Sequence, residues 1–156
     1  MADATYQPKV YRKQGGDKIV VASGGQIAAD EGGYFLRNTP TPATVTTAAT
    51  LTTAGMLGGL ITGSDTDGST VAITLPTGTV MSTAITVDND QSFDFTFINL
   101  SPDEIADTYT LTAATGFTIV GRPIIDSIHA DAEFPNAGTF RCRQTAANTW
   151  VAYRIN

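Results

Sequence analysis

The strongest pattern in the sequence is an alternation of phenylalanine with other residues across residues 92–100. Phe93, Phe95 and Phe97 occupy every second position, and Asn99 continues the series. Because successive side chains of a β-strand point to opposite faces of the sheet, this spacing predicts a half-buried strand. Its aromatic face is expected to anchor the hydrophobic core.

The composition extends this expectation to the rest of the chain. Only 15% of the residues are charged, and threonine fills much of the difference from an average soluble protein. β-Branched side chains lose rotamer freedom on a helix and fit well on a pleated sheet. Short runs that end at Gly, Pro or Asn predict further strands at residues 44–52, 60–62, 71–75, 109–112, 117–120, 139–144 and 150–155.

The turns between these segments predict how the strands are connected. Residues 109–112 and 117–120 are expected to pair through the short connection between them, and the last two segments to form a hairpin. A single helical turn is predicted at residues 53–57, and a short helix at residues 77–84 with Thr77 as its N-cap. Many short, evenly spaced strands imply an all-β domain, either a β-sandwich or a barrel.

Residues 1–40 differ from the rest, and we interpret them as an extended, glycine-rich N-terminal arm that precedes a domain at residues 41–156. Three glycine pairs within residues 15–33 alternate with short apolar runs, which predicts strands separated by turns. These segments form either a small β-meander or a few rungs of a solenoid-like stack that neighbouring chains complete. Pro40 and Pro42 mark the boundary, because two prolines so close together cannot sit in a central strand.

The formal net charge of −6 is concentrated in the middle of the chain. Residues 41–136 contain one basic and eleven acidic side chains, a balance that would repel nucleic-acid phosphates. We interpret this acidity as a contribution to solubility. The N-terminal residues lack a basic region followed by an apolar run, and no apolar segment approaches the length of a membrane span. We therefore expect no nucleic-acid partner, no membrane partner and no export.

No catalytic motif is recognisable in the sequence. His129 is the only histidine, and although it could form an acid–base pair with Asp131 or Asp126, a loop histidine without a chemical role fits better. Cys142 is the only cysteine, so it cannot form an intrachain disulfide, and it is expected to be buried and inert. Glycine motifs typical of nucleotide binding are missing. The sequence therefore predicts a protein that is not an enzyme and holds no cofactor.

Aspartates gather in two turns. Asp65 and Asp67 precede Gly68 in a fragment of a calcium-binding loop, but the third ligand and the closing bidentate Glu are missing. Asp88 and Asp90 lie in a similar polar stretch. We interpret all four as solvated turn aspartates that hydrogen-bond the nearby backbone, and we predict no metal site.

The N-terminal arm contains the best candidates for partner binding. Its basic and aromatic side chains are interleaved, as in an RNA-binding tail or in an extended segment that adds as a strand to a partner protein. Three cations are a weak signal for phosphate, and interface hot spots favour aromatic and arginine side chains, so docking to protein is the preferred interpretation. The candidate partner-binding residues are Tyr6, Pro8, Lys9, Tyr11, Arg12 and Lys13.

Five segments carry a likeness to a known family: residues 4–25, 57–62, 74–78, 92–95 and 113–121. The first resembles the start of phage proteins found beside major capsid genes. The others resemble the core of capsid decoration proteins, also called cement or head-stabilising proteins, of tailed bacteriophages. The likeness covers most of the chain, and its motifs are structural rather than catalytic.

The resemblance implies a structural virion protein that is β-rich and commonly trimeric. Such a protein binds the outer surface of the expanded capsid and stabilises the junctions between capsomers against internal pressure. The implied partners are the major capsid protein and further copies of the chain itself. The implied location is the capsid exterior, after synthesis in the cytoplasm of the bacterial host.

Two other functions remain as alternatives. The first is a phage head-fibre, tail-fibre or spike component whose β domain binds carbohydrate, with Trp150 or Tyr153 beside Asp65 or Asp67 as a lectin-like site. The second is a hydrolase with His129 as its general base, an interpretation that depends on that residue alone.

Overall fold

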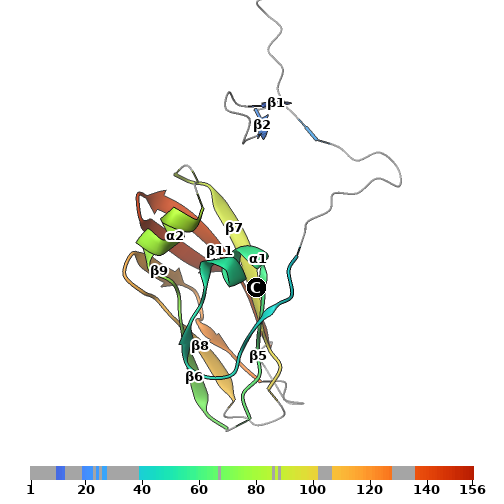
Figure 1. The fold of residues 1–156 in the computed structure, drawn as a ribbon, viewed down its shortest axis with the longest axis vertical. Helices are drawn as coiled ribbons and strands as arrows, with labels where there is room; N and C mark the ends of the chain where they lie inside the picture. The colour runs from blue at the N-terminus through green and yellow to red at the C-terminus, as the bar shows by residue number, and fades with distance from the viewer. Residues whose placement is uncertain are drawn as a thin grey trace, which may run out of the picture. The chain divides into compact units, whose positions relative to one another are not determined.

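The computed structural model describes residues 10–12, 19–22, 24, 26–27, 39–66, 68–85, 87, 89–101, 107–127 and 136–156. The chain divides into two compact units, Met1–Asn38 and Thr39–Asn156. Figure 1 shows the elements of both units.

Strands account for 49% of the described residues and helices for 12%, so the predicted β-rich class is confirmed. In the first unit the strands are β1 (Val10–Arg12) and β2 (Ile19–Val21). The second unit contains β3 (Ala43–Val45), β4 (Ala49–Thr50), β5 (Leu60–Gly63), β6 (Thr70–Thr74), β7 (Ser92–Asn99), β8 (Thr108–Thr112), β9 (Phe117–Val120), β10 (Ile124–Ile125), β11 (Ala137–Ala146) and β12 (Thr149–Arg154). Its helices are α1 (Thr53–Gly58) and α2 (Gly78–Ala84).

The strands of the second unit form two sheets. One has six strands in the order β3-β5-β7-β11-β12-β9, and the other has four in the order β10-β8-β6-β4. From β3 to β8 the chain passes from one sheet to the other after every strand. Neighbours within a sheet therefore run in the same direction, and β3, β5 and β7 are parallel, as are β4, β6 and β8.

This alternation corrects two predictions, one about strand pairing and one about a single strand. Residues 109–112 and 117–120 do not pair with each other: β8 is parallel to β6 in the smaller sheet, and β9 is parallel to β12 in the larger one. The single strand predicted at residues 44–52 is instead two short strands, β3 and β4, at edges of different sheets. The short connections favoured pairing between segments that are neighbours in the sequence. Because consecutive strands instead alternate between two sheets, each strand pairs with one further along the chain.

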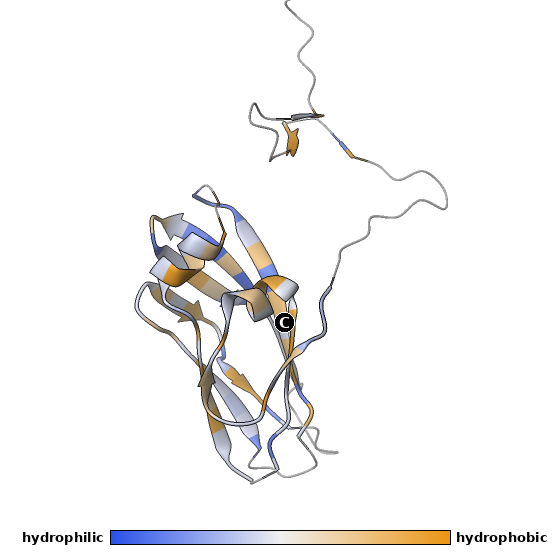
Figure 2. Cartoon of the chain, viewed as in Figure 1, coloured by the Kyte–Doolittle hydropathy of each residue, from blue (hydrophilic) through white to orange (hydrophobic). Residues whose placement is uncertain are grey.

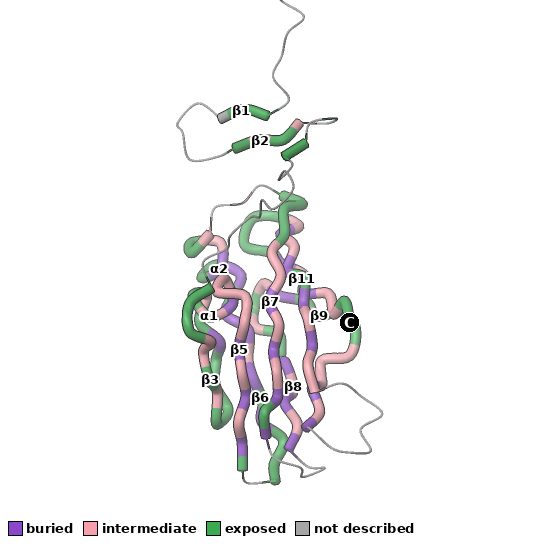
Figure 3. Tube along the Cα trace, turned by 90° about the vertical axis from the view of Figure 1, so that its right-hand side faces the viewer, coloured by how far each residue is buried: buried purple, intermediate pink, exposed green. Residues whose placement is uncertain are grey.

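Both sheets contribute to one hydrophobic core. Ile61, Phe95 and Phe140 come from the larger sheet, and Ile73 and Leu111 from the smaller one, all at most 2% exposed. Along the strands, buried residues alternate with more exposed ones (Figure 3). The alternation is the period-2 burial expected for strands that are covered on one face.

Strand β7 matches the prediction made from its phenylalanines. Phe95, Phe97 and Asn99 are buried and Phe93 is half-buried, while the intervening side chains are more exposed. Phe95 stacks on the Phe140 ring of β11 with 5.4 Å between ring centroids. The predicted aromatic face therefore lies in the core, and the prediction is confirmed.

The two predicted helical pieces are also confirmed. Thr52 and Thr77 are the N-caps of α1 and α2, and each accepts a hydrogen bond from the backbone N–H three residues later. These bonds satisfy donors that a helix leaves unpaired in its first turn. Helix α1 lies in the connection from β4 to β5, and α2 in that from β6 to β7.

The predicted C-terminal hairpin is present as β11 and β12. The two strands are antiparallel, with Cys142 opposite Ala152 and Gln144 opposite Trp150. Arg154, near the end of β12, donates hydrogen bonds to the backbone carbonyls of Arg122, Ile124 and Ala137. The Arg154 side chain therefore links β12 to β10 of the smaller sheet and to β11 of the larger sheet.

In the first unit, β1 and β2 form an antiparallel pair, which we call the N-terminal hairpin. Its register places Val10 opposite Val21, Tyr11 opposite Val20 and Arg12 opposite Ile19. Strand β2 is strongly hydrophobic (Figure 2). The third glycine pair and the residues around it lie outside the described residues.

Candidate functional site

The N-terminal hairpin exposes apolar side chains on both of its faces. Exposed fractions are 37% for Val10, 44% for Tyr11, 63% for Ile19 and 44% for Val21. Because neighbouring side chains of a strand alternate, Val10, Ile19 and Val21 share one face and Tyr11 occupies the other. A lone two-stranded hairpin is marginally stable in water, and contiguous exposed apolar groups mark interaction sites.

The structure places two of the six predicted partner-binding residues in this hairpin. Tyr11 and Arg12 lie in β1, and Tyr11 is exposed as a contact residue would be. Four of the six, Tyr6, Pro8, Lys9 and Lys13, lie outside the described residues. Val10, Ile19 and Val21 were not among the predicted partner-binding residues, because the run Ile19–Val21 is apolar throughout and shows no alternation that would single out one face.

A second notable feature is a set of buried polar residues in the β domain, which we call the polar cluster: Asp65, Asn99, Ser101, Asp107 and Tyr109. All five are 6% exposed or less. They lie in or beside the connections from β5 to β6 and from β7 to β8. These connections meet because β5 and β7 are parallel neighbours, with Gly63 opposite Asn99.

Hydrogen bonds join the backbone of the two aspartates of the polar cluster. The Asp65 N–H donates to Ser101 Oγ at 2.9 Å, and the Ser101 N–H donates to Asn99 Oδ1 at 2.9 Å. Asn99 Nδ2 then donates to the Asp107 carbonyl at 2.7 Å. The Tyr109 hydroxyl donates to the Val45 carbonyl at 2.9 Å.

The pKa of Tyr109 is raised above its ordinary value. Burial is the main cause, and the negative charges of Asp65 and Asp107 add to it, while a hydrogen bond with Ser101 opposes it. Both carboxylates are therefore within electrostatic range of the Tyr109 phenol. Gly63 makes room for this ring, because a Cβ there would lie 2.5 Å from Tyr109 Cζ.

The prediction of solvated turn aspartates is wrong for Asp65. Its side chain is buried, with Oδ1 accepting from the Thr66 N–H and Oδ2 from the Ser69 hydroxyl, both at 2.9 Å. The predicted bond to nearby backbone is therefore present, but the solvation is not. Asp67 and Asp88 lie outside the described residues.

Asp94 in β7 and Asp90 just before it form ion pairs with arginines of β11. Asp94 accepts two hydrogen bonds of 2.9 Å from the Arg141 guanidinium, and Asp90 pairs with Arg143. Asp90 has a φ of 72°, a left-handed conformation that aspartate tolerates in turns. Both pairs are partly exposed, so they contribute little to stability.

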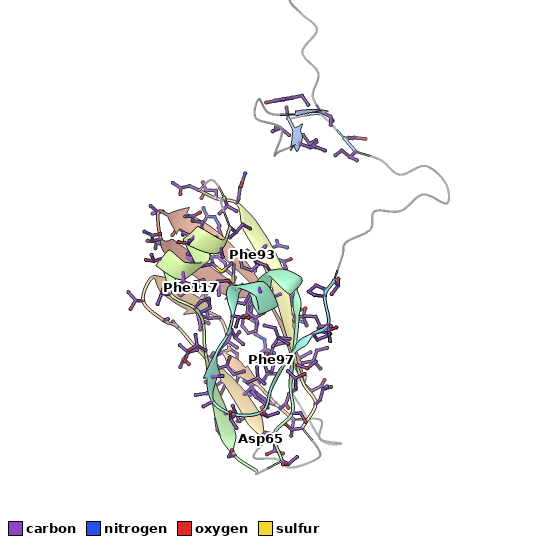
Figure 4. The ribbon with its side chains drawn as sticks, in the orientation of Figure 1. Asp65, Phe93, Phe97 and Phe117 are labelled. Atoms are coloured by element: carbon purple, nitrogen blue, oxygen red, sulfur yellow. The ribbon has the colours of Figure 1, made fainter. Side chains whose placement is uncertain are left out.

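The lectin-like site considered above is not formed around Trp150. That side chain is 0% exposed, and its indole N–H donates to Ser82 Oγ at 3.0 Å. Phe93 and Phe117 pack against the Trp150 ring, and both lie toward the end of the domain away from Asp65 (Figure 4). Trp150 therefore belongs to the core, as expected for a large aromatic residue whose N–H has found a partner.

The residues considered for catalysis form no reactive constellation in the described part of the chain. Cys142 is buried, as predicted, and burial raises the pKa of its thiol to about 12, which disfavours the reactive thiolate. Asp126 forms an ion pair with Arg122, and His129 and Asp131 lie outside the described residues. Among the described residues, no three His, Cys, Asp or Glu side chains come together as metal ligands.

A pocket of about 280 Å³ opens where β3 and β4 separate into their two sheets. Its lining is threonine and aliphatic, including Thr44, Thr46, Thr50, Leu51 and Ile61. The pocket lies at two exposed sheet edges and holds no ionisable side chain in its lining, so it offers a surface for packing rather than groups for catalysis.

Comparison of the chain with protein-family models, with curated proteins and with solved structures gives no match. Within the described residues, neither helix has the length and hydrophobicity needed to cross a bilayer.

Proposed function

We propose that this protein is a non-enzymatic structural component that attaches to a large protein assembly through its N-terminal hairpin. The assembly that fits best is the expanded capsid of a tailed bacteriophage, whose outer surface the protein would decorate. Its partners would be the major capsid protein and further copies of itself, with a trimer as the expected oligomer. The resemblance of the sequence to capsid decoration proteins supports the choice of assembly.

The observation that carries this proposal is the exposed apolar surface of the N-terminal hairpin. Val10, Ile19 and Val21 form one face that the described residues leave uncovered, and Tyr11 adds an aromatic group on the other. Transfer of such side chains from water into an interface is favourable by about 25 cal/mol per Å² of apolar surface. Neither edge of the hairpin pairs with another strand of the described residues, and such edges can hydrogen-bond to a partner strand.

The second unit fits the role of a rigid body. Two sheets that share one core are the arrangement of a β-sandwich, and we infer that architecture for residues 39–156, with the glycine-rich first unit as its arm. The described residues of its outer surface carry ion pairs and paired threonines, which suit a structural role.

The proposed mechanism is selective binding to one state of the capsid. A ligand that binds only the expanded lattice stabilises that lattice by its own binding free energy. Several weak contacts in one oligomer then combine through their high effective concentration. Internal DNA pressure would be resisted at each occupied junction.

Binding of the purified protein to expanded capsid shells tests the proposal, with occupancy measured by co-sedimentation. We expect deletion of residues 2–16 to abolish binding, and Val21→Thr to weaken it about 5- to 30-fold, corresponding to about 1 to 2 kcal/mol for a buried aliphatic contact. Val120→Thr is the matched control, since Val120 is a strand valine of the β domain with 46% exposure against 44% for Val21. Undiminished binding by the deletion variant, or equal losses for both valine variants, would refute docking through the hairpin.

The fibre or spike alternative has less support. It needs an exposed aromatic side chain close to turn carboxylates, and of its two candidates Trp150 is buried. Tyr153 is half-buried on the outer face of β12, where it bonds with Arg143. A glycan array with no binding, together with electron microscopy that places the protein on capsid faces, would exclude this alternative.

A further inference from the structure

Asp107 is a buried acidic residue whose surroundings favour a bound cation. It is 0% exposed, and neither of its carboxylate oxygens accepts a hydrogen bond from the residues that the structure describes. Burial of an ionised carboxylate without donors is strongly unfavourable, so such groups bind a cation or take up a proton. In the described part of the chain, the arginine ion pairs involve Asp90, Asp94 and Asp126 instead.

A second buried carboxylate, that of Asp65, belongs to the same hydrogen-bonded cluster. Asp65 is linked to Asp107 through the hydrogen bonds of Ser101 and Asn99 described above. Both negative charges also contribute to the raised pKa of the one Tyr109 phenol, so both lie within electrostatic range of it. Two like charges at one buried point repel each other, and a bound cation would convert that repulsion into attraction.

The donor atoms available are of one chemical kind. The polar cluster offers carboxylate, amide, hydroxyl and phenol oxygens, and none of its members has a nitrogen or sulfur donor of the type that zinc prefers. Calcium binds hard oxygens in irregular geometry and accepts carboxylates in bidentate fashion. Asp107, with both oxygens unengaged, is suited to such a contact.

We propose that the polar cluster binds a calcium ion, with the carboxylates of Asp107 and Asp65 as its charged ligands. The neutral oxygens of Asn99 and Ser101 lie beside them as further ligands. The turn that begins at Asp65 resembles part of a calcium loop, and Asp107 supplies from a distant segment the carboxylate that the turn itself lacks. The ion would bridge the β5–β6 and β7–β8 connections and so join the two sheets at this end.

Thermal unfolding of the full-length protein at pH 7 tests this site. The protein is first freed of metal with EDTA and then melted with calcium, with magnesium or without either. We expect calcium at about 100 times its Kd to raise Tm by about 5 °C, with a smaller rise for magnesium. Asp107→Asn, which removes the charge and keeps the size, should lose the calcium-dependent rise.

Asp126→Asn is the matched control, because Asp126 pairs with Arg122 outside the polar cluster and its loss should leave the calcium response intact. Terbium emission excited through tyrosine gives a second measurement on the unsubstituted protein, and calcium should compete with it. That measurement decides the matter even if Asp107→Asn fails to fold. A Tm that is independent of both ions with no terbium emission, or an equal calcium response in both variants, would overturn the proposal.

Discussion

Substitution of Gly63 by alanine tests whether Tyr109 and Phe97 are held as the structure places them. A Cβ at Gly63 would lie 2.5 Å from Tyr109 Cζ and 2.8 Å from Phe97 Cζ, closer than carbon atoms approach without displacement. Both rings are fully buried, so neither can move aside into solvent. Overpacking of this kind costs about 1 to 3 kcal/mol, and the lower chain entropy of alanine in the unfolded state offsets about 0.4 to 1 kcal/mol.

Since these contacts are well under 3.0 Å and both rings are buried, the overpacking cost lies at the upper end of its range, and the expected net loss for Gly63→Ala is about 2 kcal/mol in the free energy of unfolding. With a denaturant slope of about 2 kcal/mol per M, the midpoint of urea unfolding should fall by about 1 M. Gly138→Ala is a graded control, because its Cβ would meet the Phe140 ring at 3.0 Å, where a small shift suffices. We expect its midpoint to change by less than half as much. If Gly63→Ala matches the unsubstituted protein with the same slope, the rings are not fixed over Gly63, and the reasoning is refuted.

Three further predictions concern the β domain. Thr77→Ala removes the N-cap bond of α2 and should lower stability by about 1 kcal/mol in calorimetry, whereas Thr77→Ser should retain most of it. Arg154→Met leaves the carbonyls of Arg122 and Ala137 without their donor, and a loss of about 1 to 3 kcal/mol in urea unfolding is expected; a change within error would show that water replaces the guanidinium. Cys142 has a folded pKa of about 12 against an ordinary value of 9.0, so its stabilising contribution is complete below pH 9 and is lost as pH rises toward 12. Stability should fall by up to about 1.4 kcal/mol per pH unit there, and Cys142→Ala should show a shallower fall; equal slopes would contradict the assignment.

Local patterns predicted the local structure well. The alternating phenylalanines of β7 and the C-terminal hairpin follow from the two-residue period of a strand covered on one face, and the helix at residues 78–84 follows from its threonine N-cap. Each of these depends on residues that are neighbours along the chain. The burial of Cys142 belongs to the same group, because its strand alternates apolar and basic residues.

Strand pairing was less predictable, because nothing in the sequence marks the change from one sheet to the other. The run at residues 44–52 is uniformly rich in threonine and alanine, so its division into β3 and β4 leaves no signal in hydrophobicity. The connection between β8 and β9 has the length of a hairpin turn but joins two sheets. A short connection that closes a hairpin and one that crosses to another sheet can have the same length, and they differ only in which strands the connected segments pair with.

The polar cluster shows the consequence of this topology for function. Asp65 and Asp107 are more than forty positions apart, and a chain of local hairpins would give no reason for their turns to meet. Because β5 and β7 are parallel in one sheet and β6 and β8 are parallel in the other, the connections from β5 to β6 and from β7 to β8 must reach the same end of the domain. Parallel pairing therefore brings the two carboxylates together. If neighbouring strands are assumed to be antiparallel, each aspartate is assigned to a solvated turn, so the burial of the Asp107 carboxylate is recognised only once the strand order is known.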